Sequence, residues 1–304
     1  MKCMFSNEET SSEEHVLPRW MQKRYALANQ AYNLPNGSQI AYRNAKVPAA
    51  AAHNGKFGEI EDRVSRNVAS LQDLYLWAFK VHIGLIYRSA SLRVDIRSPT
   101  SPNFWKVEGF GQEVWLFQQL YSIWSRGGTI SPDPFGTVFR IKALTSAERF
   151  DFIHNIQSGT MFFQLGAELV FVSLYDQARA MMSNMPAQLE WYRGYVSSLR
   201  EDKRDDAAFI AQRIWASESA YFLYRSRGGM NYVATEDSFT VIPPLTRLET
   251  RPSDEEEYRN FCRSFGLKLK SFGGEAGHTY SEFSADDLQA LRSGDQNHRT
   301  DAGA

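Results

Sequence analysis

Two short polar segments near the N-terminus contain the residue types needed to bind a divalent metal ion and deprotonate water. The first is Glu14-His15-Val16-Leu17-Pro18, and the second is Ala50-Ala51-Ala52-His53-Asn54-Gly55, which is followed by Glu61. A carboxylate next to a histidine can supply a metal ligand and a general base, and an asparagine can supply a further oxygen ligand. If the two segments meet in space, we expect a hydrolytic site.

The first segment resembles the Glu-His-x-x-Pro box of HNH endonucleases. The likeness is closest to a small bacterial branch with the pattern Cys-x-x-Cys, Glu-His-x-x-Pro, Cys-x-x-Cys-Asn and then a helix carrying Leu/Ile-Glu, and it covers about residues 1–66. This resemblance implies a ββα-metal unit that hydrolyses phosphodiester bonds in nucleic acid, with DNA as the expected partner. It also implies that His15 is the catalytic base and that Glu14 and Asn54 hold the metal, with Mg²⁺ or Mn²⁺ expected.

Glu61 lies two helical turns after Asn54, so the two side chains are expected on one helix face. We therefore expect Glu61 to be a third metal ligand or to support the other two. Each candidate also has a plainer interpretation. Glu14 can belong to a solvated acidic run, Asn54 can cap a helix or form a turn, and Glu61 can pair with a nearby arginine.

The chain departs from the family pattern at the structural zinc site. The four cysteines of that pattern fall on Cys3, Ser6, Ala50 and His53. Serine is a poor zinc ligand and alanine is none, so these positions do not form a closed four-ligand site. We expect the structural zinc to have been lost and its role to have been taken over by packing.

The loss of the zinc ligands raises an alternative function. In this hypothesis the protein is a catalytically inactive, HNH-like binding or scaffold protein that acts through its C-terminal region. A small-molecule pocket lined by aromatic residues of the helical region is a third hypothesis, but no specific residue supports it. Whether the protein forms a homo-oligomer is left open by the sequence.

Composition limits the classes of protein to consider. The chain has 304 residues, a net charge of −1 and two cysteines, Cys3 and Cys262. So few cysteines do not form a disulfide framework, and we expect a cytoplasmic protein. The most apolar expected helix contains Asp73, Lys80 and His82, which argues against a membrane partner. Any contact with nucleic acid must rest on a local basic patch, such as the basic edge formed by Lys80, Arg88, Arg93 and Arg97.

The hydrophobic pattern predicts an α+β protein. A turn at Asn36-Gly37 and a helix over 55–68 fit the ββα unit, and Ser70 is expected to cap a long helix over 71–87. A helix is expected over 111–125, followed by a small antiparallel sheet over 135–174 and helices over 175–226. The expected domains are an HNH-like unit over 1–68, a mostly helical domain with the small antiparallel sheet over 69–272, and a flexible tail over 273–304.

Several predictions concern single positions within these elements. His82 and His154 are expected to be core histidines, the latter on a β-strand face shared with Phe152 and Ile156. Asp205-Asp206 is expected to open the last long helix. Ser253 with Glu256 is expected to form a capping box for a short helix over 254–265.

Overall fold

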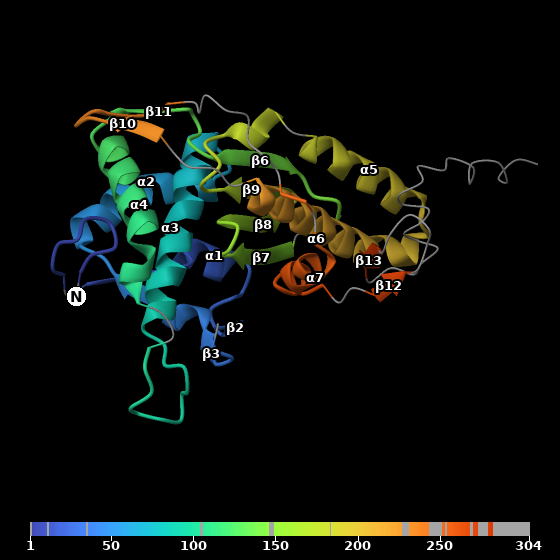
Figure 1. Cartoon of the computed structure of the whole chain (residues 1–304), viewed down its shortest axis with the longest axis horizontal. Helices are drawn as coiled ribbons and strands as arrows, with labels where there is room; N and C mark the ends of the chain where they lie inside the picture. Colours follow the sequence, from blue (N-terminus) through green and yellow to red (C-terminus); the bar gives the residue numbers. More distant parts are fainter. Residues whose placement is uncertain are drawn as a thin grey trace, which may run out of the picture. The chain divides into compact units, whose positions relative to one another are not determined.

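The computed structural model contains both helices and small β-sheets (Figure 1). It describes residues 2–10, 12–34, 36–103, 106–145, 149–182, 184–226, 231–242, 251–252, 254–267, 270–272 and 279–281. The chain divides into two compact units, Met1–Val138 with Gly229–Arg247 and Phe139–Gly228 with Leu248–Ala304. Among the described residues, none of the helices combines the length and the apolar character needed to span a bilayer.

The first unit contains four α-helices and three small sheets among its described residues. Its helices are α1 (Arg19–Arg24), α2 (Ala51–Ser65), α3 (Leu71–Ala90) and α4 (Gly111–Ser125), with the 3₁₀ turns η1 (Tyr42–Asn44) and η2 (Val107–Phe110). Its strands are β1 (Glu13–His15), β2 (Ala31–Asn33), β3 (Gln39–Ala41), β4 (Lys46–Pro48), β5 (Thr129–Ser131), β10 (Asn231–Ala234) and β11 (Ser238–Ile242). The sheets are β1–β4, β2–β3 and β10–β11–β5.

Two antiparallel strand pairs organise the N-terminal part of this unit. Strands β2 and β3 form a hairpin whose turn contains Asn36 and Gly37, as the sequence predicted, and Gly37 has the positive φ of 78° that this turn needs. Strand β1 pairs with β4, placing Glu14 opposite Val47 and His15 opposite Lys46. Because α2 begins three residues after β4, this pairing brings Glu14 and His15 close to that helix.

Helix α2 begins earlier than the sequence predicted. It starts at Ala51 rather than Gly55, and it ends at Ser65 rather than Val68. Alanine has the highest intrinsic helix propensity, so Ala51 and Ala52 begin the helix even though Ala50, at the N-cap, has no side chain that can cap it. Gly55 consequently lies inside the helix and not at its start.

Helix α3 lies at the centre of the first unit. Ser70 caps it as predicted, in a capping box in which the Asp73 backbone N–H donates to the Ser70 hydroxyl and Asp73 accepts the Ser70 N–H. Helices α2 and α4 and strand β4 contact α3. The segment after β1 also approaches closely, since a Cβ added at Gly84 would lie 3.3 Å from both methyl carbons of Val16. Glycine at this position therefore lets the Glu-His-x-x-Pro segment lie directly on α3.

The second unit contains the expected antiparallel sheet, with strands in the order β6–β9–β8–β7. The strands are β6 (Thr137–Lys142), β7 (Arg149–Asn155), β8 (Thr160–Gly166) and β9 (Glu168–Ser173). The turn η3 (Arg179–Met182), the helices α5 (Met185–Ser198), α6 (Glu201–Arg225) and α7 (Glu255–Arg263), and the short pair β12 (Lys270–Phe272) and β13 (Thr279–Ser281) complete it.

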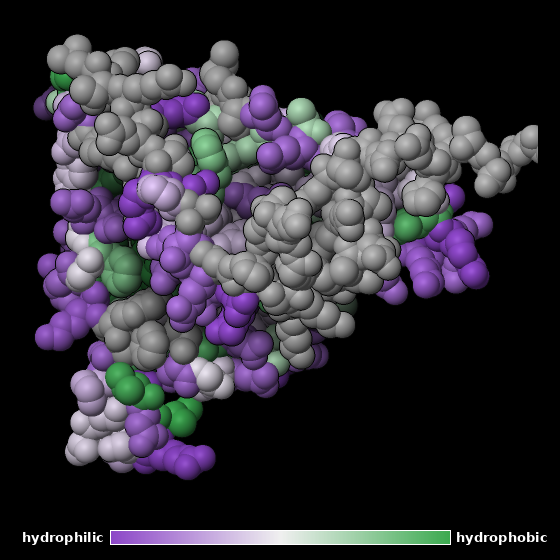
Figure 2. All heavy atoms as spheres, turned by 45° about the vertical axis from the view of Figure 1, so that its right-hand side comes forward, coloured by the Kyte–Doolittle hydropathy of each residue, from purple (hydrophilic) through white to green (hydrophobic). Residues whose placement is uncertain are grey.

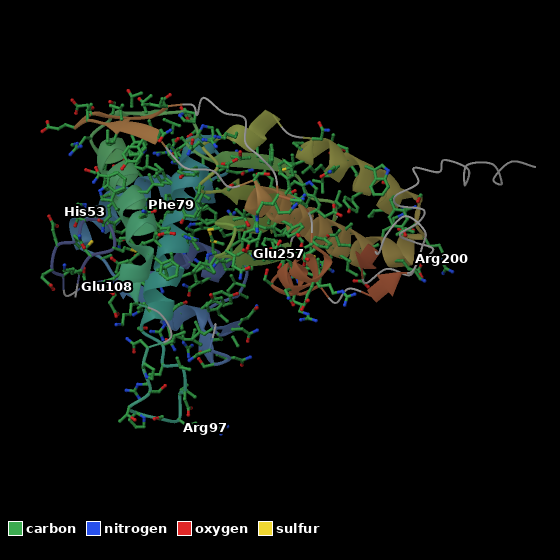
Figure 3. All side chains as sticks on the ribbon, in the orientation of Figure 1. His53, Phe79, Arg97, Glu108, Arg200 and Glu257 are labelled. Carbon is green, nitrogen blue, oxygen red and sulfur yellow. The ribbon has the colours of Figure 1, made fainter. Side chains whose placement is uncertain are left out.

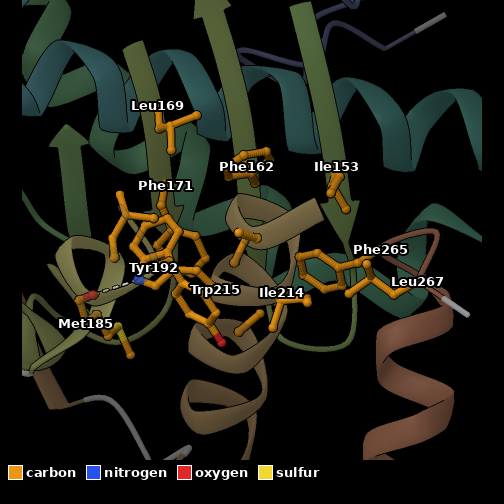
Figure 4. Packing of buried hydrophobic residues seen from close by; sticks show 14 of the residues in the cluster. Ile153, Phe162, Leu169, Phe171, Met185, Tyr192, Ile214, Trp215, Phe265 and Leu267 are labelled. Atoms are coloured by element: carbon orange, nitrogen blue, oxygen red, sulfur yellow. Dashed lines mark hydrogen bonds between the residues drawn. The ribbon is translucent and has the colours of Figure 1, made fainter. Parts of the chain in front are cut away.

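Helices α5, α6 and α7 pack against one face of this sheet. In the hydrophobic core, Trp215 of α6 contacts Phe171 of β9, and the Trp215 indole N–H donates to the Met185 carbonyl at 2.6 Å (Figure 4). On β7, Ile153 joins this core, whereas Phe152 and His154 on the other side of the strand are half-buried. Both sides of β7 are therefore partly covered.

Two helices of this unit begin at other residues than the sequence predicted. Helix α6 begins at Glu201 and not at Asp205-Asp206, because the preceding charged residues continue the helix. Asp254 caps α7 by accepting the Glu257 backbone N–H at 2.7 Å, while Ser253 lies outside the described residues. Most of the expected tail over 273–304 also lies outside them, apart from strand β13.

Candidate functional site

Three charged side chains from three elements meet in the first unit. Lys80 of α3 places its Nζ 2.9 Å from Oε1 of Glu14 on β1 and 3.0 Å from Oε1 of Glu61 on α2. The same ammonium group donates to the backbone carbonyl of His15 at 2.7 Å. Three N–H donors thus meet three oxygen acceptors, which satisfies the hydrogen-bonding capacity of a lysine ammonium.

The Glu14–Lys80–Glu61 cluster is largely removed from water. The side chain of Lys80 is 1% exposed, and those of Glu14 and Glu61 are 12% and 17% exposed. Burial by itself lowers the pKa of Lys80, but the facing carboxylates of Glu61 and Glu14 outweigh it and the pKa lies above its ordinary value. Burial raises the pKa of Glu61, an effect that the Lys80 charge opposes. Lys80 is therefore charged at neutral pH and is held by its two partners.

A second ion pair fixes α2 against α3 and so helps to position Glu61. Arg63 of α2 donates two hydrogen bonds to Asp73 of α3, at 2.9 and 2.7 Å. Such a paired guanidinium–carboxylate contact is geometrically specific. Because Asp73 also belongs to the capping box of α3, the contact joins the end of one helix to the start of the next.

His15 lies next to the cluster, but its imidazole has a separate partner. The Gln22 side-chain amide donates to the Leu17 carbonyl at 2.8 Å and lies 3.3 Å from Nδ1 of His15. Because the Gln22 amide nitrogen donates to the Leu17 carbonyl, it is the nitrogen and not the oxygen of this amide that faces His15. Nδ1 of His15 is therefore an acceptor, and a neutral imidazole carries its proton on Nε2. Burial, and then the charge of Arg19, lower the pKa of His15. His15 is consequently a neutral histidine whose available lone pair already receives a hydrogen bond.

Asn54 lies apart from the Lys80 contacts. It is in the first turn of α2, half-buried, and its backbone N–H donates to the Ala50 carbonyl. Seven residues separate it from Glu61, which is about 10 Å along a helix. Of the four residues in the expected site, the structure brings Glu14, Glu61 and the His15 backbone around one point, where Lys80 lies. Within the described part of the chain, no group of three or more His, Cys, Asp and Glu side chains is arranged to hold a metal ion.

Two of the positions that align with the family's zinc cysteines, Cys3 and Ala50, lie next to each other. Cys3 is fully buried, and its Sγ accepts the backbone N–H groups of Phe5 at 3.4 Å and Ala50 at 3.2 Å. Ser6 donates instead to Glu8. The cysteine therefore joins the N-terminal segment to the start of α2 through hydrogen bonds.

His53, which aligns with the last of the family's four zinc cysteines, makes different contacts. Figure 3 labels His53, whose Nδ1 lies 3.2 Å from the Tyr121 hydroxyl and whose Nε2 lies 3.4 Å from Glu8. Its ring also meets Tyr121 edge-on, and Phe5 packs against Tyr121 nearby. Aromatic packing between the N-terminal segment, α2 and α4 thus surrounds these positions.

Sequence reasoning placed Lys80 on a basic edge with Arg88, Arg93 and Arg97 and did not identify it as a member of the site. The basic edge does not include Lys80, because its side chain is 1% exposed and paired with two carboxylates. The signal for Lys80 in the sequence was its position in the middle of an apolar helix. A lysine buried in such a helix is rarely found without a paired acid. That signal indicates a partner but does not say which of the 35 acidic residues it is.

Comparison with known proteins gives no relative. No protein-family model matches the chain, and no curated protein or solved structure shows significant similarity to it.

Proposed function

We propose that this chain is a binding or scaffold protein with an HNH-like N-terminal region in which a lysine takes the place of the metal ion. The observation that carries the proposal is the position of Lys80 Nζ between the carboxylates of Glu14 and Glu61. The HNH resemblance assigns Glu14 to the metal, and Glu61 is the residue expected to be a third ligand or to support the other two. The proposed function is accordingly one of binding and not of phosphodiester hydrolysis.

Electrostatics supports this proposal. A divalent ion needs the oxygen atoms that Lys80 already occupies, and hard cations bind oxygens at about 2.0–2.6 Å. To admit the ion, the Lys80 ammonium must leave both carboxylates and the His15 carbonyl. Because an ammonium buried without a partner is strongly disfavoured, Lys80 competes effectively with added metal.

The hydrogen bonding of His15 is a second, independent support. A general base must present an unprotonated nitrogen to water. The Nδ1 lone pair of His15 accepts from Gln22, which leaves Nε2 with the proton. In this arrangement neither ring nitrogen presents a free lone pair that could remove a proton from water.

A metal-dependent HNH endonuclease acting on DNA is the competing function. The convergence of Glu14 and Glu61, and a His15 whose lowered pKa keeps it neutral, favour it. In that case Mg²⁺ or Mn²⁺ would bind at Glu14 and Glu61, polarise the phosphate and stabilise the leaving oxygen. Lys80 would have to move out of the site and Gln22 would have to release His15.

Incubation with supercoiled plasmid separates these functions. Wild type, His15→Ala and Lys80→Ala are incubated with Mg²⁺, with Mn²⁺ or with EDTA, and nicked product is measured on gels. We expect the wild type to show no metal-dependent nicking above the His15→Ala background. Metal-dependent nicking by wild type that disappears in His15→Ala would establish the endonuclease and refute the binding proposal.

A further inference from the structure

Strand β10 forms one edge of the β10–β11–β5 sheet, which lies beside α4 (Figure 1). Among the described residues, β11 is the one strand that pairs with β10. All four residues of β10, from Asn231 to Ala234, are exposed, so the side of the strand away from β11 is open to solvent. An edge strand of this kind offers its backbone N–H and C=O groups to another strand.

The backbone groups on the open side of β10 belong to Tyr232 and Ala234. In the turn that joins β10 to β11, the Thr235 N–H donates to the Ser238 carbonyl at 2.8 Å. Successive residues of an antiparallel strand point their N–H and C=O groups alternately toward and away from the partner strand. Because Thr235 points toward β11, Ala234 and Tyr232 point away from it. Each of these two residues therefore has a donor and an acceptor for an added strand.

Apolar side chains border this edge on both faces of the sheet. On the face toward α4, the Tyr232 ring stacks on Phe239, with 4.9 Å between centroids, and lies 5.3 Å from Trp115 of α4. Tyr232 is 39% exposed and Trp115 is 37% exposed, so neither ring is fully covered. On the opposite face, Val233 is 50% exposed and Ile242 is 48% exposed.

This group of half-exposed apolar side chains contrasts with the rest of the surface. Hydrophilic residues predominate on the face shown in Figure 2, and the hydrophobic ones form small separate groups. Of the nine large hydrophobic side chains that are exposed in the described part of the chain, four lie at the β10 edge. A concentration of apolar surface around an open strand edge indicates an interaction site.

We propose that the occupant of this edge is β10 of a second copy of the chain, paired antiparallel about a two-fold axis at Val233. In this register Val233 lies opposite Val233 of the second copy, and Tyr232 lies opposite Ala234 of the second copy. The two Tyr232–Ala234 pairs exchange backbone hydrogen bonds, which uses every outward-facing N–H and C=O of both residues. The two edges close each other, and the two sheets become one continuous sheet.

The side chains favour this register over the neighbouring one. The two-fold axis is perpendicular to the sheet, so α4 of both copies lies on the same face and one residue must lie opposite itself. With Val233 at the axis, two apolar side chains meet on one face, and on the other face each Tyr232 ring lies beside the small Ala234. With Tyr232 at the axis, two bulky rings would meet and Asn231 would lie opposite Val233.

Charge favours a second copy over an unrelated peptide. Strands β5, β10 and β11 contain no Asp, Glu, Lys or Arg, so two copies of the edge approach without like-charge repulsion. The acidic turn Glu236-Asp237 lies at one end of β10, and antiparallel pairing places the two turns at opposite ends of the interface. Strand β10 also lacks the lysine, proline or bulge by which monomeric proteins protect an edge. The edge is therefore complementary to itself.

Sedimentation equilibrium of the full chain over roughly 1–200 µM tests the inference. A pairing this short belongs to the small, transient class of interfaces, so we expect a reversible monomer–dimer equilibrium with a Kd on the order of 10–100 µM. Val233→Lys and Val233→Glu each place two like charges opposite each other, and we expect each to weaken dimerisation about tenfold. An equimolar mixture of the two variants should dimerise again, because lysine then faces glutamate. Recovery in the mixture also shows that both variants fold.

Cysteine cross-linking tests the register directly. Val233 forms the non-hydrogen-bonded pair, in which facing Cβ atoms are close enough for a disulfide. Val233→Cys should give a covalent dimer on mild oxidation, and the natural Cys3 and Cys262 do not interfere because both are buried. Val68→Cys changes a valine that is 62% exposed elsewhere in the first unit and should remain monomeric on gels.

Val68→Lys is the matched control for an added surface charge and should dimerise as wild type does. The inference is overturned by a wild type that is monomeric at every concentration. Dimerisation that Val233→Lys leaves intact, or a mixture of the Val233→Lys and Val233→Glu variants that stays monomeric, would also overturn it. Because the measurements use neither metal nor nucleic acid, their outcome is independent of the plasmid experiment.

Discussion

The Nζ of Lys80 lies 3.0 Å from Oε1 of Glu61, although 19 residues separate the two in sequence and they belong to different helices. The Lys80 side chain is 1% exposed, so this contact is nearly shielded from solvent. Glu14, 66 residues before Lys80 and on a third element, is the second carboxylate that binds the ammonium. One ammonium therefore joins β1, α2 and α3.

Removing the ammonium should strongly destabilise the first unit. In Lys80→Met, two carboxylates face each other with no cation, and loss of one partner of a buried ion pair costs about 3–5 kcal/mol. We expect a decrease of this size in the free energy of unfolding measured by urea denaturation. Glu14→Leu/Glu61→Met/Lys80→Met removes all three charges and should recover most of the loss, whereas an equal loss in both variants would contradict the role of charge.

Divalent ions should stabilise a variant from which the lysine side chain has been removed. In Lys80→Ala the carboxylates of Glu14 and Glu61 are available to a hard cation, and a ligand that binds only the folded state stabilises it. We expect millimolar Mn²⁺ to raise the Tm of Lys80→Ala by several degrees, since roughly 2–4 °C corresponds to 1 kcal/mol. Wild type and Glu14→Gln/Glu61→Gln/Lys80→Ala are the controls that should not respond.

The tautomer of His15 should depend on Gln22. While the Gln22 amide donates to Nδ1, the proton of neutral His15 is expected on Nε2. Long-range ¹H–¹⁵N correlation spectra of the imidazole at neutral pH test this directly. Gln22→Leu should allow a mixture of tautomers, while Gln30→Leu, which changes an exposed glutamine, should leave the His15 signals unchanged. An Nδ1–H tautomer in the wild type would contradict the assignment.

Stability should fall in mild acid because of His154. Burial lowers the pKa of His154 to about 4, below the ordinary value near 6.5 that applies in the unfolded chain. Above pH 6.5 the histidine is neutral in both the folded and the unfolded state, so its titration does not change the free energy of unfolding. As the pH falls from 6.5 to 4, the unfolded chain takes up the proton first, so stability decreases by at most about 1.4 kcal/mol per pH unit.

Urea unfolding of wild type and His154→Gln across this range measures the contribution. The difference in unfolding free energy between the two proteins should shrink as the pH falls and level off near pH 4. His15, whose pKa is also lowered, contributes in the same direction and is common to both proteins. A difference that does not change with pH would show that His154 does not titrate as described.

Local features of the sequence determined most of the elements. Ser70 and Asp73 form the capping box that fixes the start of α3, and Asn36-Gly37 fixes the β2–β3 turn. The alternation of apolar residues over 135–174 predicted the antiparallel strands. These features could be predicted because caps, turns and periodicity depend on residues within a few positions of one another. The starts of α2 and α6 were displaced because neither has a capping side chain to mark it.

Only the tertiary structure decided what the acidic residues contact. The sequence places Glu14 beside His15 and Glu61 on a helix, and both facts suit a metal ion as well as a lysine. The choice depends on how α3 packs against β1 and α2, which the close approach of Val16 to Gly84 and the Arg63–Asp73 pair help to fix. Periodicity defines a helix face but not the element opposite it, so the pairing of Lys80 with two distant carboxylates follows from packing alone.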